Sequence, residues 1–119
     1  MEQIFIKDYV YPTEIGVFDS EHGTEQRLRF NVTLTVDYKR TNRLDSLENV
    51  VSYEVILESI WSVLSGGRLN LLETLAEKIS QCCLKQDEVK KIDIQIEKLD
   101  RIDGSLGVRL IREKNKSIE

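Results

Sequence analysis

The stretch from Glu25 to Tyr38, EQRLRFNVTLTVDY, decides the fold class of this 119-residue chain. Apolar and polar side chains alternate along it without a break, which is typical of a β-strand with one buried face. The apolar members are Leu28, Phe30, Val32, Leu34, Val36 and Tyr38. The stretch therefore predicts an amphipathic strand in a sheet that is covered on one side.

Three further strands are predicted around it. Residues 3–10 are rich in Ile, Phe, Tyr and Val, and we expect this first strand to bend near Pro12. Residues 90–98 alternate again through three isoleucines, and a last strand, centred on Val108, follows a turn at Asp103 and Gly104. The strands thus form two adjacent pairs, which favours hairpins over parallel crossovers.

Two helices are predicted between the strand pairs. The first has its apolar residues at helical spacing between Val51 and Leu64, with Ser52 as N-cap and Gly66-Gly67 as the stop. The second begins near Asn70 and ends near Gln86. Its buried face is formed by Leu72, Leu75, Ala76, Ile79 and Cys83.

The predicted element order is ββααββ in a single domain, residues 1–119. This order indicates an α+β fold, an antiparallel four-stranded sheet with two helices on one face. The edge strands of such a sheet stay open unless another copy pairs with them. We therefore expect oligomerisation through the sheet edges.

Composition excludes several classes of function. The 17 Lys and Arg against 21 Asp and Glu give a net charge of -4, which argues against nucleic-acid binding. No apolar run is long enough to span a membrane, and no signal-peptide pattern opens the sequence. Adjacent Cys82 and Cys83 form no disulfide framework, and His22 is the single histidine. We expect a cytoplasmic protein with no metal and no cofactor.

No phosphate-binding glycine loop, nucleophile elbow or Cys-His pair is present. What remains are ionisable residues at the ends of elements. Glu73 follows Asn70 by three residues, which favours a capping box. The alternative is that this carboxylate, at a helix N-terminus, accepts two hydrogen bonds from the amidine-like edge of a heterocycle, with the N–H groups of Leu72 and Glu73 as added donors.

Lys98 has the same strand parity as the isoleucines of its segment. It either extends out of the sheet edge or, when withdrawn from water, becomes a proton-transfer group, and the pattern does not choose between these. By pattern alone, Tyr53 is a packing residue at a helix start, Glu21 is a solvated loop charge, and both cysteines are unreactive core or helix residues.

The ordered set of these residues resembles the dihydroneopterin aldolase family of folate biosynthesis. The resemblance covers nearly the whole chain and rests on Ile15-Gly16-Val17, Glu21, Gln26, Asp45, Ser52-Tyr53, Leu71-Leu72-Glu73, Leu75-Ala76-Glu77 and Lys98. It implies the tunnelling fold, in which the sheets of four copies join into a barrel and two such rings stack into an octamer. The active sites would then lie between subunits.

The resemblance also implies a lyase that splits 7,8-dihydroneopterin into 6-hydroxymethyl-7,8-dihydropterin and glycolaldehyde, with possible epimerisation at C2'. Glu73, with the main chain of Leu72, would bind the pterin. Lys98 would be the acid/base, Tyr53 of an adjacent subunit would relay protons, and Glu21 would contact the substrate or its water. Neither a metal nor a cofactor is required, because the substrate's own imine accepts the electrons.

One residue departs from the family pattern: Leu99 follows Lys98 where members commonly have proline. The Lys-Leu pair is similar to that of the related dihydroneopterin triphosphate epimerases, which is the first alternative function. Arg101, Arg68 and Lys39 are the cations available for a triphosphate. The second alternative is a non-catalytic oligomer that binds pterins or purines.

Overall fold

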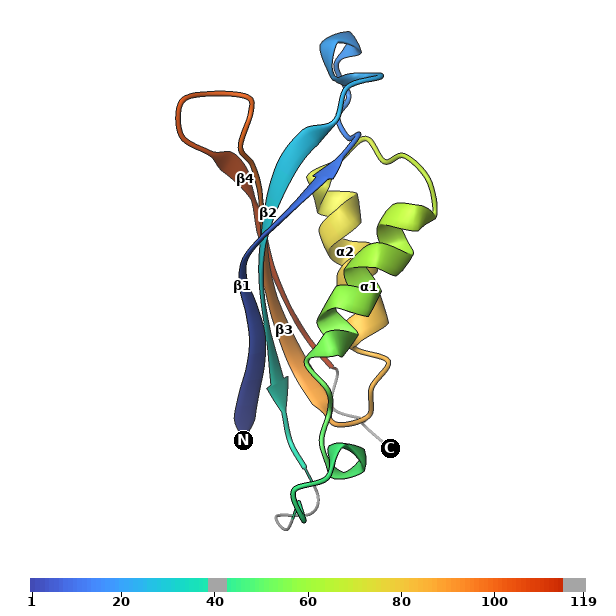
Figure 1. Ribbon diagram of the computed structural model, residues 1–119, viewed down its shortest axis with the longest axis vertical. Helices are drawn as coiled ribbons and strands as arrows, with labels where there is room; N and C mark the ends of the chain where they lie inside the picture. Colours follow the sequence, from blue (N-terminus) through green and yellow to red (C-terminus); the bar gives the residue numbers. More distant parts are fainter. Residues whose placement is uncertain (39–42, 115–119) are drawn as a thin grey trace.

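The computed structural model describes residues 1–38 and 43–114 and has the predicted order of elements (Figure 1). The strands are β1 (Glu2–Thr13), β2 (Gln26–Val36), β3 (Val89–Lys98) and β4 (Leu106–Glu113). The helices are α1 (Glu54–Ser65) and α2 (Leu72–Cys83), and two short 3-10 helices, η1 (Asp19–Glu21) and η2 (Leu47–Asn49), lie in the connections.

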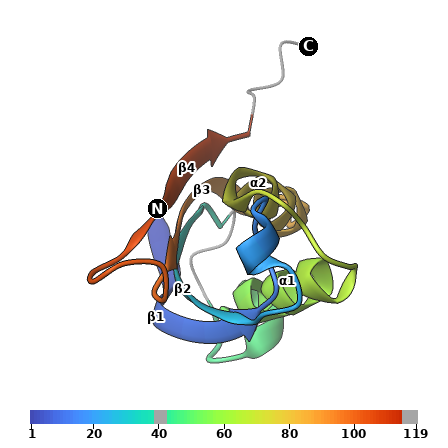
Figure 2. The same cartoon turned by 90° about the horizontal axis from the view of Figure 1, so that it is seen from above.

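The four strands form one antiparallel sheet in the order β1-β2-β3-β4. Both helices lie on the same face of the sheet, which curves around them (Figure 2). The predicted α+β architecture is therefore confirmed. Within this chain β1 and β4 are the edge strands.

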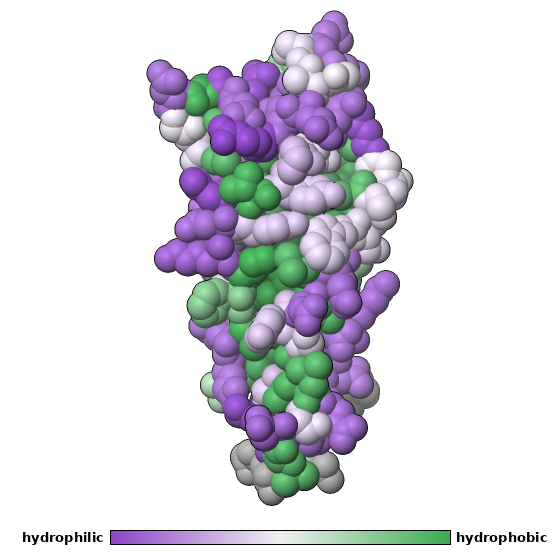
Figure 3. Space-filling view, viewed as in Figure 1, coloured by the Kyte–Doolittle hydropathy of each residue, from purple (hydrophilic) through white to green (hydrophobic). Residues whose placement is uncertain are grey.

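The apolar rows that defined the elements form the core between the sheet and the helices. Leu28 to Val36 on β2 and Ile92 to Ile96 on β3 bury every second side chain, and all five apolar residues expected on the inner face of α2 are buried. In Figure 3, polar residues gather at the upper end, over the connection from β1 to β2. No helix in residues 1–38 and 43–114 is long and apolar enough to cross a membrane.

The bend of β1 lies at Asp8 and not near Pro12. The register between β1 and β2 shifts between Ile6 and Tyr9, and Asp8 has a φ of 54°. The Asp8 N–H leaves the ladder and donates to the Asn31 side-chain oxygen at 2.9 Å. Pro12 continues the strand because β1 is an edge strand in this chain, where a missing N–H leaves no neighbour unpaired.

Both helices begin one or two residues later than predicted. Tyr53 precedes α1, and the Ser52 hydroxyl accepts a hydrogen bond from the Glu54 N–H at 3.2 Å. Leu71 precedes α2, so Asn70 is not its N-cap. Helix α2 ends at Cys83 rather than near Gln86, because the chain turns there toward β3.

Candidate active site

A buried carboxylate stands at the end of the sheet where β3 finishes. Glu21, in η1, is only 2% exposed. Its Oε2 accepts hydrogen bonds from Lys98 Nζ at 2.6 Å and from Gln26 Nε2 at 3.0 Å. Its Oε1 accepts a longer one from the Phe18 N–H at 3.3 Å. The prediction that Glu21 is a solvated loop charge was wrong.

The hydrogen bonds keep this carboxylate ionised in spite of its burial. Burial has the largest single influence on Glu21 and raises its pKa. The hydrogen bonds from Lys98, Gln26 and the Phe18 N–H together outweigh burial and lower the pKa to about 2. At neutral pH the site therefore holds a buried carboxylate ion beside the Lys98 amine.

The glycine of the Ile15-Gly16-Val17 sequence makes room for the carboxylate. A Cβ at Gly16 would overlap the carboxylate carbon of Glu21, and the φ of Gly16 is +133°, a conformation that favours glycine. Gln26 holds the same turn, because its Nε2 also donates to the Ile15 carbonyl at 2.7 Å. The two motif residues Gly16 and Gln26 are thus explained by the position of Glu21.

Lys98 is the last residue of β3 and pairs with Leu28 in the sheet register. Its side chain lies on the face of the sheet that carries the helices, as its parity with Ile96 predicted. The side chain is 13% exposed and its Nζ contacts Glu21. Lys98 therefore does not extend into solvent, and its role in proton transfer stays a prediction.

The start of α2 is tied to this cluster through Arg68. The Arg68 guanidinium donates to the Gly16 carbonyl at 2.5 Å, to Glu14 at 2.7 Å and to the Asn70 side-chain oxygen at 2.8 Å. The Gly16 N–H in turn donates to the Leu69 carbonyl at 3.4 Å. These bonds place the first turn of α2 at the same end of the sheet as Glu21 and Lys98.

This arrangement overturns the predicted capping box of Asn70 and Glu73. The Asn70 side chain accepts from Arg68, and the helix begins after Leu71 without a side-chain cap. Leu72 packs into the core, whereas Glu73 is exposed. Within residues 1–38 and 43–114, the Glu73 carboxylate makes no hydrogen bond or ion pair, so it is available to a ligand.

Tyr53 lies at the opposite end of the molecule. Next to it, the Val51 N–H donates to the Tyr38 hydroxyl at 3.0 Å, just beyond the end of β2. Lys98 pairs with Leu28 and Val89 with Val36, so the two ends are separated by eight residues of β2, about 26 Å at the usual rise per residue. Tyr53 is 67% exposed, so it is not the packing residue that its position predicted.

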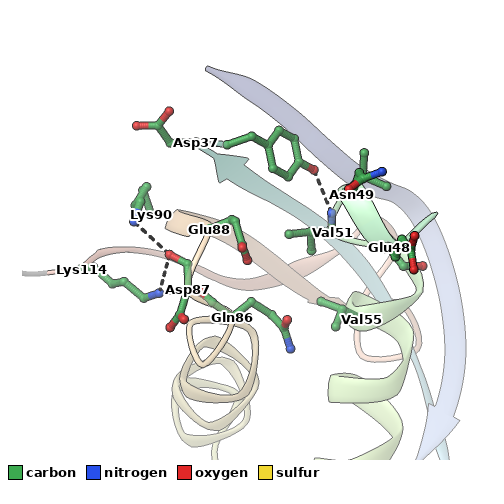
Figure 4. Close-up of a pocket in the computed structure, with 13 residues that line it drawn as sticks. Asp37, Glu48, Asn49, Val51, Val55, Gln86, Asp87, Glu88, Lys90 and Lys114 are labelled. Carbon is green, nitrogen blue, oxygen red and sulfur yellow. Dashed lines mark hydrogen bonds between the residues drawn. The ribbon is translucent and has the colours of Figure 1, made fainter. Parts of the chain in front are cut away.

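A cavity of about 1080 Å³ also lies at the Tyr53 end and not at Glu21 (Figure 4). Tyr38, Ser52 and Val55 line it on one side, and the turn from Gln86 to Glu88 lines the other. Lys90 and Lys114 both donate to the Asp87 carbonyl across its rim. The cavity and the buried ion pair are therefore separate features of the chain.

Arg101 is the site residue that sequence reasoning did not assign to the pair. Its Nη1 lies 3.6 Å from Glu21 Oε2, and its guanidinium carbon lies 5.6 Å from the centre of the Phe18 ring. No sequence signal points to this contact, because Arg101 belongs to an irregular connection between two strands. Lys39, the third cation considered for a phosphate, lies outside the described residues.

Thiol and metal chemistry have little support in the described residues. Burial raises the pKa of the Cys83 thiol to about 11, which keeps it protonated, as expected of a core cysteine. Within residues 1–38 and 43–114, no three His, Cys, Asp or Glu side chains are grouped as a metal site requires. What the site offers is a buried carboxylate and lysine, suited to proton transfer, beside a free carboxylate.

Comparison with known proteins identifies the family. Residues 4–110 match the family model described as "FolB: Dihydroneopterin aldolase". The dihydroneopterin aldolase of Streptomyces coelicolor is 34% identical over 85 residues, 71% of each protein. That of Escherichia coli K12 is 27% identical over 119 residues, 100% of this chain and 98% of the relative.

The fold matches in the same way. The crystal structure of E. coli dihydroneopterin aldolase in complex with neopterin superposes with a TM-score of 0.84 at 28% identity, covering 94% of this chain and 99% of that one. This chain belongs to the dihydroneopterin aldolase family, and its function is that of an aldolase, a lyase of folate biosynthesis.

Proposed function

We propose that this member of the dihydroneopterin aldolase family splits the C1'–C2' bond of 7,8-dihydroneopterin, giving 6-hydroxymethyl-7,8-dihydropterin and glycolaldehyde. The observation that carries the proposal is the Glu21–Lys98 pair at 2.6 Å, beside the uncommitted carboxylate of Glu73 at the start of α2. The Glu21–Lys98 pair can transfer protons, and the Glu73 carboxylate can bind the pterin ring.

The reaction needs only proton transfers from the protein. A base removes the proton of the 2'-hydroxyl, the C1'–C2' bond breaks, and C2' leaves as the aldehyde carbon of glycolaldehyde. The bond electrons move through C1' and C6 to N5, which takes up a proton. Protonation of C1' and loss of the proton on N5 then restore the imine and complete the product.

Lys98 is the acid and base of this scheme, and it acts at the 2'-hydroxyl through a water molecule and at N5. Glu21 accepts a hydrogen bond from Lys98 Nζ and keeps the amine directed toward the substrate. The ionised Glu21 also binds the substrate side chain or the ordered water. Re-addition of glycolaldehyde to the same intermediate would invert C2', which explains how epimerisation could accompany cleavage.

Glu73 and the first turn of α2 bind the pterin. The carboxylate accepts two parallel hydrogen bonds from the 2-amino group and the adjacent ring N–H. The first N–H groups of a helix have no partner within the helix, so the main chain at Leu72 is available to the ring. The exposure of Glu73 and the absence of an Asn70 cap support this role.

Tyr53 reaches the site from a neighbouring subunit. Its exposure and its distance from Lys98 within one chain support an assembly in which sheet edges pair and bring opposite ends together. We propose a tetrameric ring, stacked in pairs into an octamer, with the active sites between subunits. The free thiols of Cys82 and Cys83 support a cytoplasmic location.

The test of the reaction is incubation of the protein with 7,8-dihydroneopterin, with glycolaldehyde and the pterin product both measured. We expect equal amounts of the two products. Tight binding of the pterin without turnover would instead support the non-catalytic oligomer. No binding and no turnover would contradict both.

The shared site has its own test, co-expression of a Tyr53→Phe chain with a Lys98→Met chain. Neither variant alone should turn over substrate at an appreciable rate. In mixed rings, about a quarter of the sites would combine an intact Lys98 with an intact Tyr53 of the partner subunit, so activity should return to about a quarter of the native level. No recovery in verified mixed rings would place Tyr53 in its own chain's site.

Glu73→Gln tests the binding role. It removes an ionised acceptor, so the affinity for a pterin should fall by about 1.5 to 3 kcal/mol, roughly 10- to 150-fold. Glu77→Gln is the matched control, because Glu77 lies one turn later on α2 and is paired with Arg112 at 2.9 Å. If both variants bind the pterin like the native protein, Glu73 has no part in ring recognition.

The second candidate function is the triphosphate epimerase. The observation in its favour is Arg101, whose guanidinium stands at the Glu21–Lys98 pair, together with Leu99 after Lys98. Comparing kcat/KM for dihydroneopterin and its triphosphate decides between the two, because phosphate contacts would appear in that ratio.

A further inference from the structure

Arg101 faces the same carboxylate oxygen as Lys98. Its Nη1 stands 3.6 Å from Glu21 Oε2, which also accepts the Lys98 and Gln26 hydrogen bonds. At this distance the contact is an ion pair and not a hydrogen bond. The Arg101 side chain is 34% exposed and lies over the Phe18 ring, so its position is fixed on one side by an aromatic residue of the Glu21 turn.

We propose that Arg101 is a positioning residue, which holds the Glu21 carboxylate charged and in place while Lys98 gains and loses its proton. The proposal rests on the proposed function of Lys98 and gives Arg101 a role in the cleavage reaction, apart from binding a phosphate. Arg101 acts through Glu21 and needs no contact with the reacting atoms.

The reason lies in the different chemistry of the two cations. A lysine that serves as acid and base must pass through a neutral state, whereas a guanidinium stays charged at any physiological pH. When Lys98 is neutral, Glu21 at 2% exposure would be left as a buried anion without a counter-charge, which is unfavourable. Arg101 supplies the permanent counter-charge, so Glu21 keeps its position through the cycle.

Arg101 also acts on Lys98 directly. Two cations that share one carboxylate repel each other, so a neutral residue at position 101 would remove a positive charge that faces Lys98 across Glu21. Four other charged residues near the pair are matched with one another. Glu14 pairs with Arg68, and Arg27 pairs with Asp100.

Gln26 faces the pair from β2 and is neutral. Glu73 on α2 adds a negative charge at the same end of the sheet. Glu73 is present both in the native protein and in an Arg101 variant. A change seen on substitution of Arg101 can therefore be assigned to the guanidinium.

The experiment compares Arg101→Gln and Arg101→Lys with the native protein, using the pH profile of kcat/KM for 7,8-dihydroneopterin. The limb of the profile that belongs to Lys98 should move to higher pH by about half a unit to two units in Arg101→Gln. Arg101→Lys keeps the charge and should restore most of the native profile. Arg109→Gln is the control, because it also removes an arginine that pairs with a carboxylate, that of Asp93, but on the other face of the sheet.

A second measurement does not depend on turnover. The titration of the Lys98 side chain, followed by NMR with labelled lysine, should move in the same direction in Arg101→Gln. A profile and a titration that both superpose on the native ones overturn the proposal. The proposal is also overturned if the only effect of Arg101→Gln is a higher KM for the triphosphate, because Arg101 would then be a phosphate ligand. A native protein that forms no glycolaldehyde refutes the proposed function, whereas an active one with an unaltered Arg101→Gln refutes this inference alone.

Discussion

The last two residues of β3 carry two ion pairs on opposite faces of the sheet. Glu97 points to the outer face, where its carboxylate accepts a fork of hydrogen bonds from Arg29 at 3.0 and 2.8 Å and one from the Ser105 hydroxyl at 2.6 Å. Lys98 points to the helix-covered face and contacts Glu21. In both pairs the pKa of the glutamate is about 2.

The causes of these two equal values differ. The hydrogen bonds from Arg29 have the largest influence on Glu97 and lower its pKa directly. For Glu21 the largest influence is burial, which acts in the opposite direction and is overcome only by three hydrogen bonds. The cations differ as well, because Arg29 cannot release a proton and Lys98 can. A low glutamate pKa therefore does not identify an active site by itself. What distinguishes the inner pair is that its cation, Lys98, is able to transfer a proton.

Exchanging the cations should separate the two pairs most strongly. Lys98→Arg keeps a positive charge for Glu21 but removes the group that transfers protons, so kcat should fall by about 10²- to 10⁴-fold. Arg29→Lys should leave kcat unchanged and lower the free energy of unfolding by about 1 kcal/mol, since a fork is replaced by a point charge. Steady-state kinetics and urea unfolding measure the two effects.

Circular dichroism of Lys98→Arg provides the control, because a folded but inactive variant is required. If Lys98→Arg retains a tenth or more of the native kcat, then Lys98 is not the acid/base. The Glu21–Lys98 pair would in that event be structural, like its neighbour on the outer face.

In the inner pair a glycine lies against the carboxylate itself, whereas the glycine opposite the outer pair, Gly107, lies against backbone atoms of Ile96 and Glu97. Gly16→Ala would push the Glu21 carboxylate away from Lys98, and a displacement of about 1 Å at a reacting group costs roughly 10²-fold in rate. Gly23→Ala is the matched control, because Gly23 also has a positive φ but no atom lies within 4 Å of its added Cβ. Both variants should lose about 1 to 2 kcal/mol of stability from backbone strain.

Only Gly16→Ala should lose activity, as measured by kcat/KM beside the unfolding free energy. Equal loss of activity in the two variants would attribute the effect to backbone strain. The separation of the Glu21 carboxylate from Lys98 would then not matter to the rate.

The fold was largely predictable because its signal is periodic. Alternation on β2 and β3 and helical spacing on α2 each select one buried face, and the structure buries those residues. The same parity correctly placed Lys98 on the helix-covered face. The predictions of the β1 bend and of the α2 cap were wrong because a single hydrogen bond decides each of them. The Asp8 N–H donates to the Asn31 side chain, and the Asn70 side chain accepts from Arg68.

The site was less predictable, since its contacts join residues far apart in the chain. The resemblance identified Glu21 as a site residue, but the sequence pattern alone predicted that it is exposed to solvent. The short polar connection between β1 and β2 has no pattern that would indicate packing of Glu21 against Gly16. Arg101 is 80 residues after Glu21 in the sequence and lies in the connection between β3 and β4, outside any helix or strand. Such contacts follow from the tertiary structure and have no local sequence signal.

The smallest expected effect is the pH dependence of stability on the outer face. The pKa of Glu97 falls from 4.5 in the unfolded chain to about 2 in the folded one, so the stabilisation is present above pH 4.5 and is lost as the pH falls toward 2. That shift corresponds to at most about 3 kcal/mol, and screening by solvent at the partly exposed Arg29 reduces it to about 1 to 2 kcal/mol.

Glu97→Gln should therefore flatten the dependence of the unfolding free energy on pH between 4.5 and 2, with kcat/KM at neutral pH unchanged. Glu21→Gln should flatten the same window and also lower kcat/KM, because its carboxylate serves the chemistry as well as the fold. If Glu97→Gln lowers kcat/KM as much as Glu21→Gln does, the two faces of β3 are coupled, and the division between a structural pair and a reactive pair is wrong.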